Sequence, residues 1–317
     1  MPTPTLYPSL PQFRAPRRLA AYVGGLLALI FSAGVWAQPA AQGLGALTGT
    51  LKKAYESGAV TIGYREASIP FSYISARGEP MGYAIDICRA VVDAMGVAVD
   101  RELLIKWRPV TADSRIEAVT SGEVDLECGS TTSNLERQKQ VAFSPTTFIS
   151  GSKLMVKKGS PIKSFRDLVG KRVLVAAGTT GEKAMRGLSD KFKLNLNFVV
   201  TADYAEAFTQ LGADKADAFA TDDVLLYGLL AQNKAQADYT VVGEFLSYDP
   251  YAIMFRKGDA PMTALVTKTF STLAADGDLE RFYTRWFLRR LPSGVSINLP
   301  MSPQLGTIIE MMVQKPE

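Results

Sequence analysis

The sequence contains no histidine and only two cysteines, Cys88 and Cys128, among its 317 residues. Without histidine there is no Ser-His-Asp triad, no Cys-His dyad, no histidine metal site and no imidazole pH switch. Two cysteines are too few for a zinc site made of cysteine alone. We expect no metal site and no cofactor. The composition, 47% hydrophobic and 21% charged, is that of a globular chain with one large or two medium domains.

The N-terminal region has the pattern of a targeting segment. Arg14, Arg17 and Arg18 precede an uncharged run from Leu19 to Trp36, and small or aliphatic residues at positions 35 and 37 predict a signal peptide (1–37) that is cleaved after Ala37. The alternative is an uncleaved membrane anchor, because the run is close to the shortest length that spans a bilayer. Removing 1–37 takes away three of the 35 basic residues and none of the 31 acidic ones. The remaining net charge of +1 gives no support to nucleic-acid binding.

Export would place Cys88 and Cys128 in an oxidising compartment, where two cysteines can form a disulfide. Both cysteines lie in apolar stretches, Cys88 in "AIDICRAVV" and Cys128 at the end of a predicted strand. Two separately buried thiols are the other interpretation of this pattern, and the apolar surroundings favour it slightly. The sequence leaves both alternatives open.

Short β-branched runs alternate with amphipathic helical segments along the rest of the chain. This alternation predicts an α/β protein with parallel sheets that are covered by helices on both faces. The predicted helices are 50–57, 84–95, 114–121, 180–192, 204–211, 222–233, 261–275 and 279–287. The predicted strands are 59–64, 71–74, 103–110, 124–127, 172–177, 196–200 and 216–220.

These segments form two series that are separated by two extended stretches, 144–156 and 247–255. Two crossings mean that the first lobe is discontinuous in sequence. We expect lobe one to comprise 38–147 and 250–317, where the last helices and a Pro-rich tail return to it, and lobe two to comprise 148–249. A cleft between two α/β lobes joined by two strands is suited to closing on a ligand.

Polar residues follow nearly every predicted strand, at the sheet edge where α/β proteins bind ligands. An arginine fork fits a carboxylate, hydroxyl groups satisfy the remaining lone pairs, and an aspartate can hold an ammonium group. Together they fit the head group of an α-amino acid, and three arginines leave room for a second anionic group. The residues are Arg65, Thr111 to Arg115, Gly129 to Thr132, Gly178 to Gly181, and Asp222 with Asp223.

Each of these residues also has an ordinary structural interpretation. Ser133 and Glu136 match the S-x-x-E capping box of a charged helix that carries Arg137. Thr179 or Thr180, and Asp222, are good helix N-caps. The arginines could be solvated surface charges, as most arginines are.

The segments "SGAVTIGYREASIPFSY", "MGYAIDICRAVV", "SGEVDLECGSTTSNLERQKQVAFS" and "GTTGE" resemble those of the periplasmic glutamate/aspartate-binding proteins of ABC importers, within the polar amino-acid family (solute-binding proteins, family 3). The resemblance runs from about Leu47 to Phe287. It implies the type II periplasmic-binding-protein fold, which has two α/β lobes, a two-strand hinge and a ligand cleft between the lobes.

The resemblance also implies roles for eight residues. Arg137, Ser130 and Thr132 would hold the ligand α-carboxylate, Asp222 the α-ammonium, and Arg65 with Arg115 the side-chain carboxylate. Thr179 would close over the ligand from lobe two, and Tyr204 would stand where relatives have a histidine against the ligand side chain. Ala112 and Ala176 replace hydroxyl residues, so the departures concern the ligand side chain and leave the head-group site intact.

We therefore predict a periplasmic solute-binding protein that captures glutamate or aspartate by lobe closure and delivers it to an inner-membrane ABC permease. We expect a monomer that has no cofactor and binds no nucleic acid. The alternatives are a binder of glutamine or asparagine, and a periplasmic prephenate or arogenate dehydratase with Glu127 or Glu182 as general acid. A sensor ectodomain is a further class, but no signalling segment follows Phe287 in this sequence.

Overall fold

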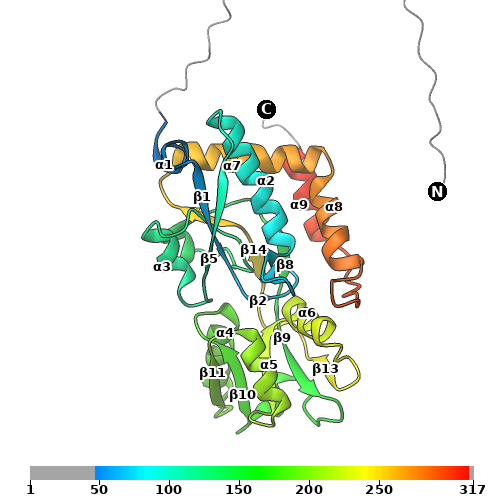
Figure 1. Cartoon of the computed structure of the whole chain (residues 1–317). Coiled ribbons are helices and arrows are strands. Elements are labelled where there is room, and N and C mark those ends of the chain that lie inside the picture. Colours follow the sequence, from blue (N-terminus) through cyan, green and yellow to red (C-terminus); the bar gives the residue numbers. More distant parts are fainter. Residues whose placement is uncertain (1–46, 314–317) are drawn as a thin grey trace, which may run out of the picture. The chain divides into compact units, whose positions relative to one another are not determined.

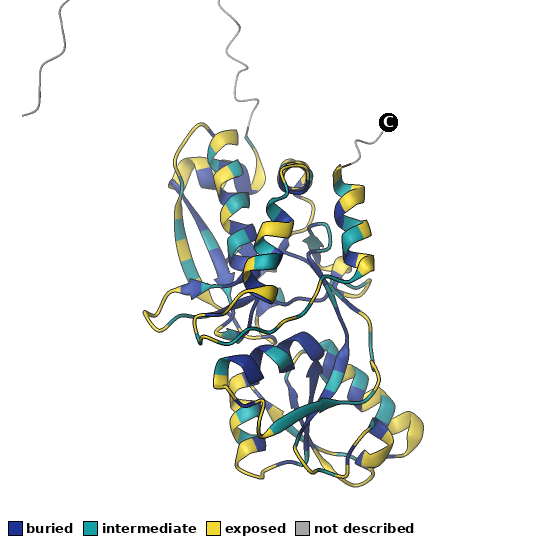
Figure 2. Ribbon diagram, turned by 90° about the vertical axis from the view of Figure 1, so that its right-hand side faces the viewer, coloured by how far each residue is buried: buried dark blue, intermediate teal, exposed yellow. Residues whose placement is uncertain are grey.

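The computed structural model describes residues 47–313. Two five-stranded sheets organise these residues, each with helices packed against it (Figure 1). The central strands and the helix faces toward them are buried, whereas the outer helix faces are exposed (Figure 2). The predicted signal peptide (1–37) lies outside the described residues.

The first sheet, which belongs to lobe one, has the strand order β5-β1-β6-β15-β7. β1 runs parallel to β5 and β6, whereas β15 runs antiparallel to β6 and β7. The strands are β1 (Ala59–Tyr64), β5 (Leu104–Pro109), β6 (Leu126–Glu127), β7 (Val141–Phe143) and β15 (Met254–Arg256). Its helices are α1 (Gly49–Ser57), α2 (Tyr83–Ala98), α3 (Arg115–Thr120), α7 (Ala260–Ala275) and α8 (Asp278–Tyr283), which continues into a short π-helix, η3 (Thr284–Leu288).

The second sheet, which belongs to lobe two, has the strand order β11-β10-β12-β9-β13. β10 is parallel to both of its neighbours, and β9 is antiparallel to β12 and β13. The strands are β9 (Ser152–Lys157), β10 (Arg172–Ala176), β11 (Asn197–Thr201), β12 (Ala218–Asp222) and β13 (Tyr239–Val242). The helices are α4 (Thr180–Phe192), α5 (Tyr204–Gly212), α6 (Asp223–Asn233) and a 3₁₀ turn, η2 (Phe165–Leu168).

The strands of the predicted βα units run parallel, as expected, but each sheet also contains an antiparallel strand that the prediction did not include. One residue separates β9 from β8 (Phe148–Ser150), and two residues separate β15 from β14 (Asp249–Tyr251); β8 and β14 are the strands that link the lobes. The chain therefore enters each sheet from the ligand edge and runs opposite to the strands of the βα units. A small three-stranded sheet, β2 (Ala67–Ser68), β3 (Ser72–Ile74) and β4 (Pro80–Met81), completes lobe one.

The two linking strands pair with each other, with Asp249 opposite Ser150 and Tyr251 opposite Phe148. An aromatic cluster packs on them. The Phe148 ring lies 4.9 Å from the Phe287 ring and 5.1 Å from the Phe71 ring, measured between centroids. Aromatic packing of this kind anchors both strands to the lobe-one core and leaves their polar ends near the ligand edge.

A helix at the C-terminal end, α9 (Pro303–Val313), was missed by the prediction of a Pro-rich tail. Proline is favourable at the first helical position, and Ser302 Oγ accepts a hydrogen bond from the Leu305 amide (3.2 Å). Leu305 and Ile309 are buried, and the helix packs against α7. The Ser-Pro pair at 302–303 was the available signal.

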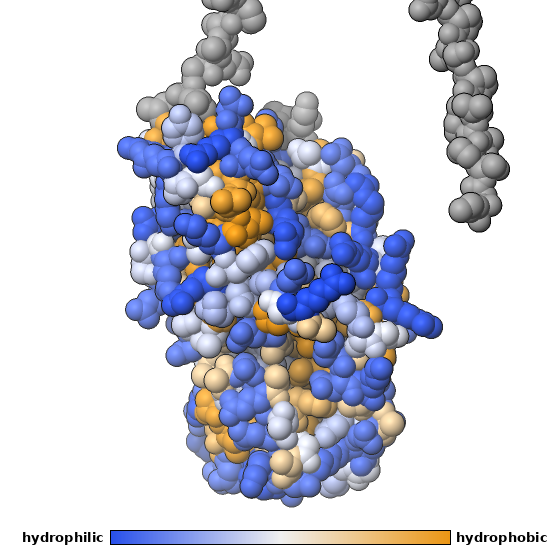
Figure 3. Space-filling model, viewed as in Figure 1, coloured by the Kyte–Doolittle hydropathy of each residue, from blue (hydrophilic) through white to orange (hydrophobic). Residues whose placement is uncertain are grey.

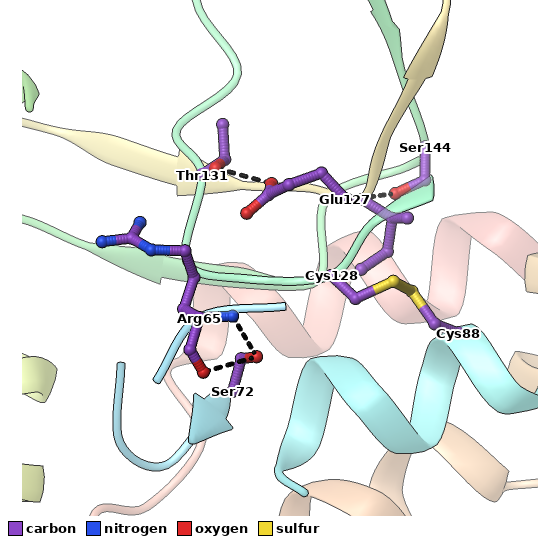
Figure 4. The surroundings of a disulfide bond; sticks show 8 residues. Arg65, Ser72, Cys88, Glu127, Cys128, Thr131 and Ser144 are labelled. Atoms are coloured by element: carbon purple, nitrogen blue, oxygen red, sulfur yellow. Dashed lines mark hydrogen bonds between the residues drawn. A yellow bond between two sulfur atoms is a disulfide. The ribbon is translucent and has the colours of Figure 1, made fainter. Parts of the chain in front are cut away.

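Cys88 and Cys128 form a disulfide (Figure 4). The bond joins helix α2 to the residue that follows β6, and both cysteines are fully buried. The interpretation as two separate thiols was therefore wrong, because apolar surroundings do not distinguish a buried disulfide from buried thiols.

Replacing both cysteines with alanine should lower the free energy of unfolding by about 4 kcal/mol, because the bond closes a loop whose ends are 40 residues apart. Urea unfolding of the double variant and of the oxidised protein measures the difference. An unchanged unfolding midpoint with an unchanged m-value would contradict this prediction.

Candidate functional site

The residues predicted to bind ligand come together where the two lobes meet. Seven of the eight are buried, and Thr179 is half-buried. Lobe one contributes Arg65 after β1, Arg115 at the start of α3, and Ser130, Thr132 and Arg137 after β6. Lobe two contributes Thr179 before α4, Tyr204 at the start of α5 and Asp222 at the end of β12.

Three guanidinium groups form the cationic end of the site. Arg65, Arg115 and Arg137 are 3%, 2% and 7% exposed. Burial, together with the charges of Arg137 and Arg65, lowers the pKa of Arg115 to about 9. Burial also lowers the pKa of Arg137. Cations that are close enough to depress one another's pKa are stabilised by an anion placed among them.

Several polar atoms in this cluster have no hydrogen-bond partner among the described residues. They include Nε and Nη1 of Arg115, Oγ of Ser130 and Oε1 of Glu127. Buried polar atoms are nearly always hydrogen-bonded in native proteins. The free donors of Arg115 and Ser130 are therefore available to an anionic ligand.

Asp222 forms the anionic end of the site. Its carboxylate accepts hydrogen bonds from Ser152 Oγ (3.1 Å) and from the Tyr251 hydroxyl. Burial and the charge of Asp249 raise the pKa of Asp222 to about 7, although the two hydrogen bonds act in the opposite direction. Asp222 occupies the N-cap position of α6 but makes no side-chain cap bond. Its carboxylate is therefore not used as a helix cap.

Thr179 caps helix α4, as the ordinary interpretation allowed. Its hydroxyl accepts from the Glu182 amide (3.0 Å) and donates to the Ala176 carbonyl (2.8 Å). The next residue, Thr180, reaches lobe one instead, with its hydroxyl 3.3 Å from that of Thr132. The sequence could not separate these roles because either threonine of the pair fits the cap.

The Arg65 guanidinium lies over the Tyr204 ring, 5.6 Å from its centroid. A cation over an aromatic face is attracted to the ring quadrupole. Tyr204 is 3% exposed and so forms a wall of the site at the first turn of α5.

The segment that carries Arg137 differs from its prediction. Instead of a charged helix there is a three-residue 3₁₀ turn, η1 (Arg137–Lys139), and Ser133 with Glu136 forms no capping box. Asn134 Oδ1 accepts from the Arg137 amide (2.9 Å), and Glu136 pairs with Lys183 of lobe two. The capping-box prediction was wrong because Asn134 closes the turn first and Glu136 points to the other lobe.

The carboxylates considered for a catalytic role are held in structural contacts. Glu127 is fully buried and accepts from Thr131 Oγ1 (2.8 Å; Figure 4). Glu182 accepts from the Gly178 amide (3.1 Å) and from Arg186 (2.8 Å). Neither contact pairs one acid with another, the arrangement typical of acid–base catalysis by carboxylates.

Within residues 47–313, no group of three or more Asp, Glu or Cys side chains is placed to hold a metal ion. In the same part of the chain, no helix has the length and apolar character required to cross a membrane. Hydrophilic residues cover most of the face seen in Figure 3, with apolar residues in small groups.

Two mixed α/β lobes, joined by paired strands and meeting at a charged site, define the class of the protein. The chain belongs to the bacterial extracellular solute-binding proteins, family 3, which match residues 60–289. It is therefore a solute-binding protein and not an enzyme, as the names of its relatives also indicate.

The chain is 42% identical over 272 residues to the L-glutamate/L-aspartate-binding protein of Pseudomonas aeruginosa. The alignment covers 85% of this chain and 90% of that relative. It is 35% identical to the glutamate/aspartate import solute-binding protein of Escherichia coli K12, covering 90% of this chain and 94% of that relative. Among solved structures, an ancestral arginine-binding protein bound to arginine aligns with a TM-score of 0.67 and 30% identity, covering 73% of this chain and 98% of that one.

The raised pKa of Asp222 predicts a pH-dependent affinity for ligands that carry an ammonium group. An ammonium partner requires the carboxylate to be ionised, so binding below pH 7 must release the proton that free Asp222 holds. Affinity should therefore fall by about tenfold from pH 8 to pH 6. Isothermal titration across this range measures it.

The chain has no histidine that could titrate in this range. Calorimetry at pH 6 in two buffers of different ionisation enthalpy should therefore detect release of one proton per ligand, and the Asp222→Asn variant should release none. An affinity that is constant from pH 6 to pH 8 would show that Asp222 is ionised before ligand arrives.

Proposed function

We propose that this protein binds glutamate or aspartate in the periplasm, closes its two lobes on the ligand, and delivers it to an ABC permease in the inner membrane. The single observation that carries the proposal is the cluster of three buried guanidinium groups in which donors of Arg115 remain unpaired. The names of the relatives from P. aeruginosa and E. coli support the same ligand class.

The charges around the arginines suggest how the ligand lies. Arg115 interacts with one carboxylate, Glu127, and with two other arginines. Arg137, by contrast, is acted on by three carboxylates, Glu127, Asp249 and Asp222. An acidic amino acid matches these charges when its ammonium group faces Asp222 and its α-carboxylate faces Arg137. Its side-chain carboxylate then faces Arg115 and Arg65.

A ligand with an amide side chain would complement these arginines less well. Glutamine or asparagine would bring no second carboxylate to the buried charges of Arg65 and Arg115, whereas glutamate or aspartate would. Ala112 and Ala176, which stand where the resemblance implies hydroxyl residues, offer no side-chain acceptor to an arginine. The preference for an acidic side chain therefore rests on the arginines.

The proposal includes the route to the periplasm and the assembly state. The leader (1–37) is removed on export, and the mature protein is a monomer. Lobe one is 38–147 and 250–317, and lobe two is 148–249. The pairing of β8 with β14 at both proposed boundaries supports this division, with the paired strands as the hinge.

Isothermal titration of the purified protein against the common amino acids tests the proposed ligand class. Glutamate and aspartate should bind at least tenfold more tightly than glutamine and asparagine, since a buried guanidinium prefers a carboxylate. Stronger binding of glutamine or asparagine, or no binding of any amino acid, would reject the proposed ligand class.

Two substitutions test the proposed orientation. Arg137→Ala should remove measurable binding of every amino acid, because it leaves the α-carboxylate buried without its partner, at a cost of about 3–5 kcal/mol. Arg115→Ala should weaken glutamate by a similar amount and glutamine far less. The matched control is Arg77→Ala, which removes an exposed arginine on the turn between β3 and β4 and should bind like the unmodified protein.

The side-chain assignment depends on the contrast between the two ligands. Equal losses for glutamate and glutamine in Arg115→Ala would place Arg115 on the head group and contradict the proposed orientation.

A further inference from the structure

One short loop of lobe two, Ala177 to Thr180, and the first turn of α4 contact lobe one. The Thr180 and Thr132 hydroxyls are 3.3 Å apart, and Lys183 pairs with Glu136 at the rim. A cavity of ≈ 380 Å³ opens beside them, lined by Asn134, Arg137, Gly178 and Thr180 among others. This loop therefore meets Arg115 and Arg137, whereas Tyr204 of the same lobe meets Arg65.

The carbonyl oxygen of Gly178 is shared by two arginines of lobe one. Nη2 of Arg137 donates to it at 3.2 Å, and Nη2 of Arg115 approaches it at 3.5 Å. The other N–H groups of these two arginines either have no partner or donate to lobe one. Nε and Nη1 of Arg115 are unpaired among the described residues, and Nη1 of Arg137 donates to the Thr132 carbonyl at 2.9 Å.

We infer that Gly178 is a positioning residue for lobe closure. Its carbonyl accepts hydrogen bonds from the N–H groups of Arg115 and Arg137 that the ligand does not use. An anion that fixes the guanidinium planes of Arg115 and Arg137 also fixes the direction of their remaining N–H groups. Those groups then hold the lobe-two loop against lobe one. The inference rests on the proposed function to the extent that the anion is the carboxylate of an amino acid.

The backbone at this position also requires glycine. Gly178 has φ +69°, a conformation that residues with a side chain rarely adopt. A Cβ atom here would lie 2.8 Å from the Cα of Asp113, 3.0 Å from its Oδ1 and 3.1 Å from the Ala112 carbonyl. All three of these atoms belong to lobe one. The methyl group of the Gly178→Ala variant would therefore collide with lobe one when the lobes close. None of the three collisions is with an atom of lobe two.

Gly170 is a matched control in the same lobe. It is exposed and has φ +68°, but a Cβ atom there would meet nothing within 4 Å. Gly170→Ala and Gly178→Ala therefore introduce the same left-handed alanine and the same backbone strain. They differ in the contact with lobe one, so a difference in ligand binding between them reports on closure.

The experiment measures glutamate affinity by isothermal titration and the radius of gyration by small-angle scattering, with and without saturating glutamate, for the unmodified protein and both variants. We expect Gly178→Ala to bind at least tenfold more weakly than Gly170→Ala and to show no ligand-induced contraction. The unmodified protein and Gly170→Ala should contract. Ligand-free thermal unfolding midpoints of the two variants should agree.

Equal affinity and equal contraction of the two variants would overturn the role of Gly178 and leave the proposed ligand intact. Failure of the unmodified protein to bind any acidic amino acid would overturn both. If Gly178→Ala does not fold, hydrogen–deuterium exchange of the unmodified protein replaces it. The peptide that spans 176–182 should gain protection with glutamate, and the peptide that spans 166–172 should not. No gain at 176–182 would reject the inference.

Discussion

The mutual repulsion of three buried guanidinium groups is the constraint on which the site depends. Arg65, Arg115 and Arg137 reach it from three different strand ends, and the pKa of Arg115 is lowered by burial and by the other two. Holding cations together in this way costs stability, which an anionic ligand repays. Arg65 follows β1 directly, and the loop that leads to Arg137 follows β6 and the disulfide-bonded Cys128.

The disulfide has a specific place in this arrangement. β6 is only two residues long, and Cys128 follows it immediately. The loop that carries Ser130 and Thr132 begins at that residue, so the bond to α2 anchors it where the sheet ends (Figure 4). The other side of the loop is held by hydrogen bonds to β14, through the amide of Ser133 and the Pro250 carbonyl (2.7 Å). The ligand loop thus lies between a covalent anchor and the hinge.

Much of the architecture could be predicted from the sequence, since the βα alternation is a local signal. Helix α4 begins and ends where it was predicted, and the residues that follow the strands do meet at one edge. What depended on tertiary context could not be predicted. The reversed strands β9 and β15 follow from the crossings between lobes, and the pairing of Cys88 with Cys128 follows from the distance between α2 and β6. Asn134 accepts the hydrogen bond from the Arg137 amide and Glu136 pairs with Lys183, whereas local capping rules predict a capping box of Ser133 and Glu136.

The central claim is that the arginine end of the site holds a side-chain carboxylate while Asp222 holds the ammonium group. A crystal structure of the protein with L-glutamate tests it most directly. We predict that the γ-carboxylate contacts Arg115 and Arg65, the α-carboxylate contacts Arg137, and the ammonium group lies within hydrogen-bond distance of Asp222. A bound glutamate whose γ-carboxylate touches neither Arg115 nor Arg65, or whose ammonium group lies away from Asp222, would contradict the account.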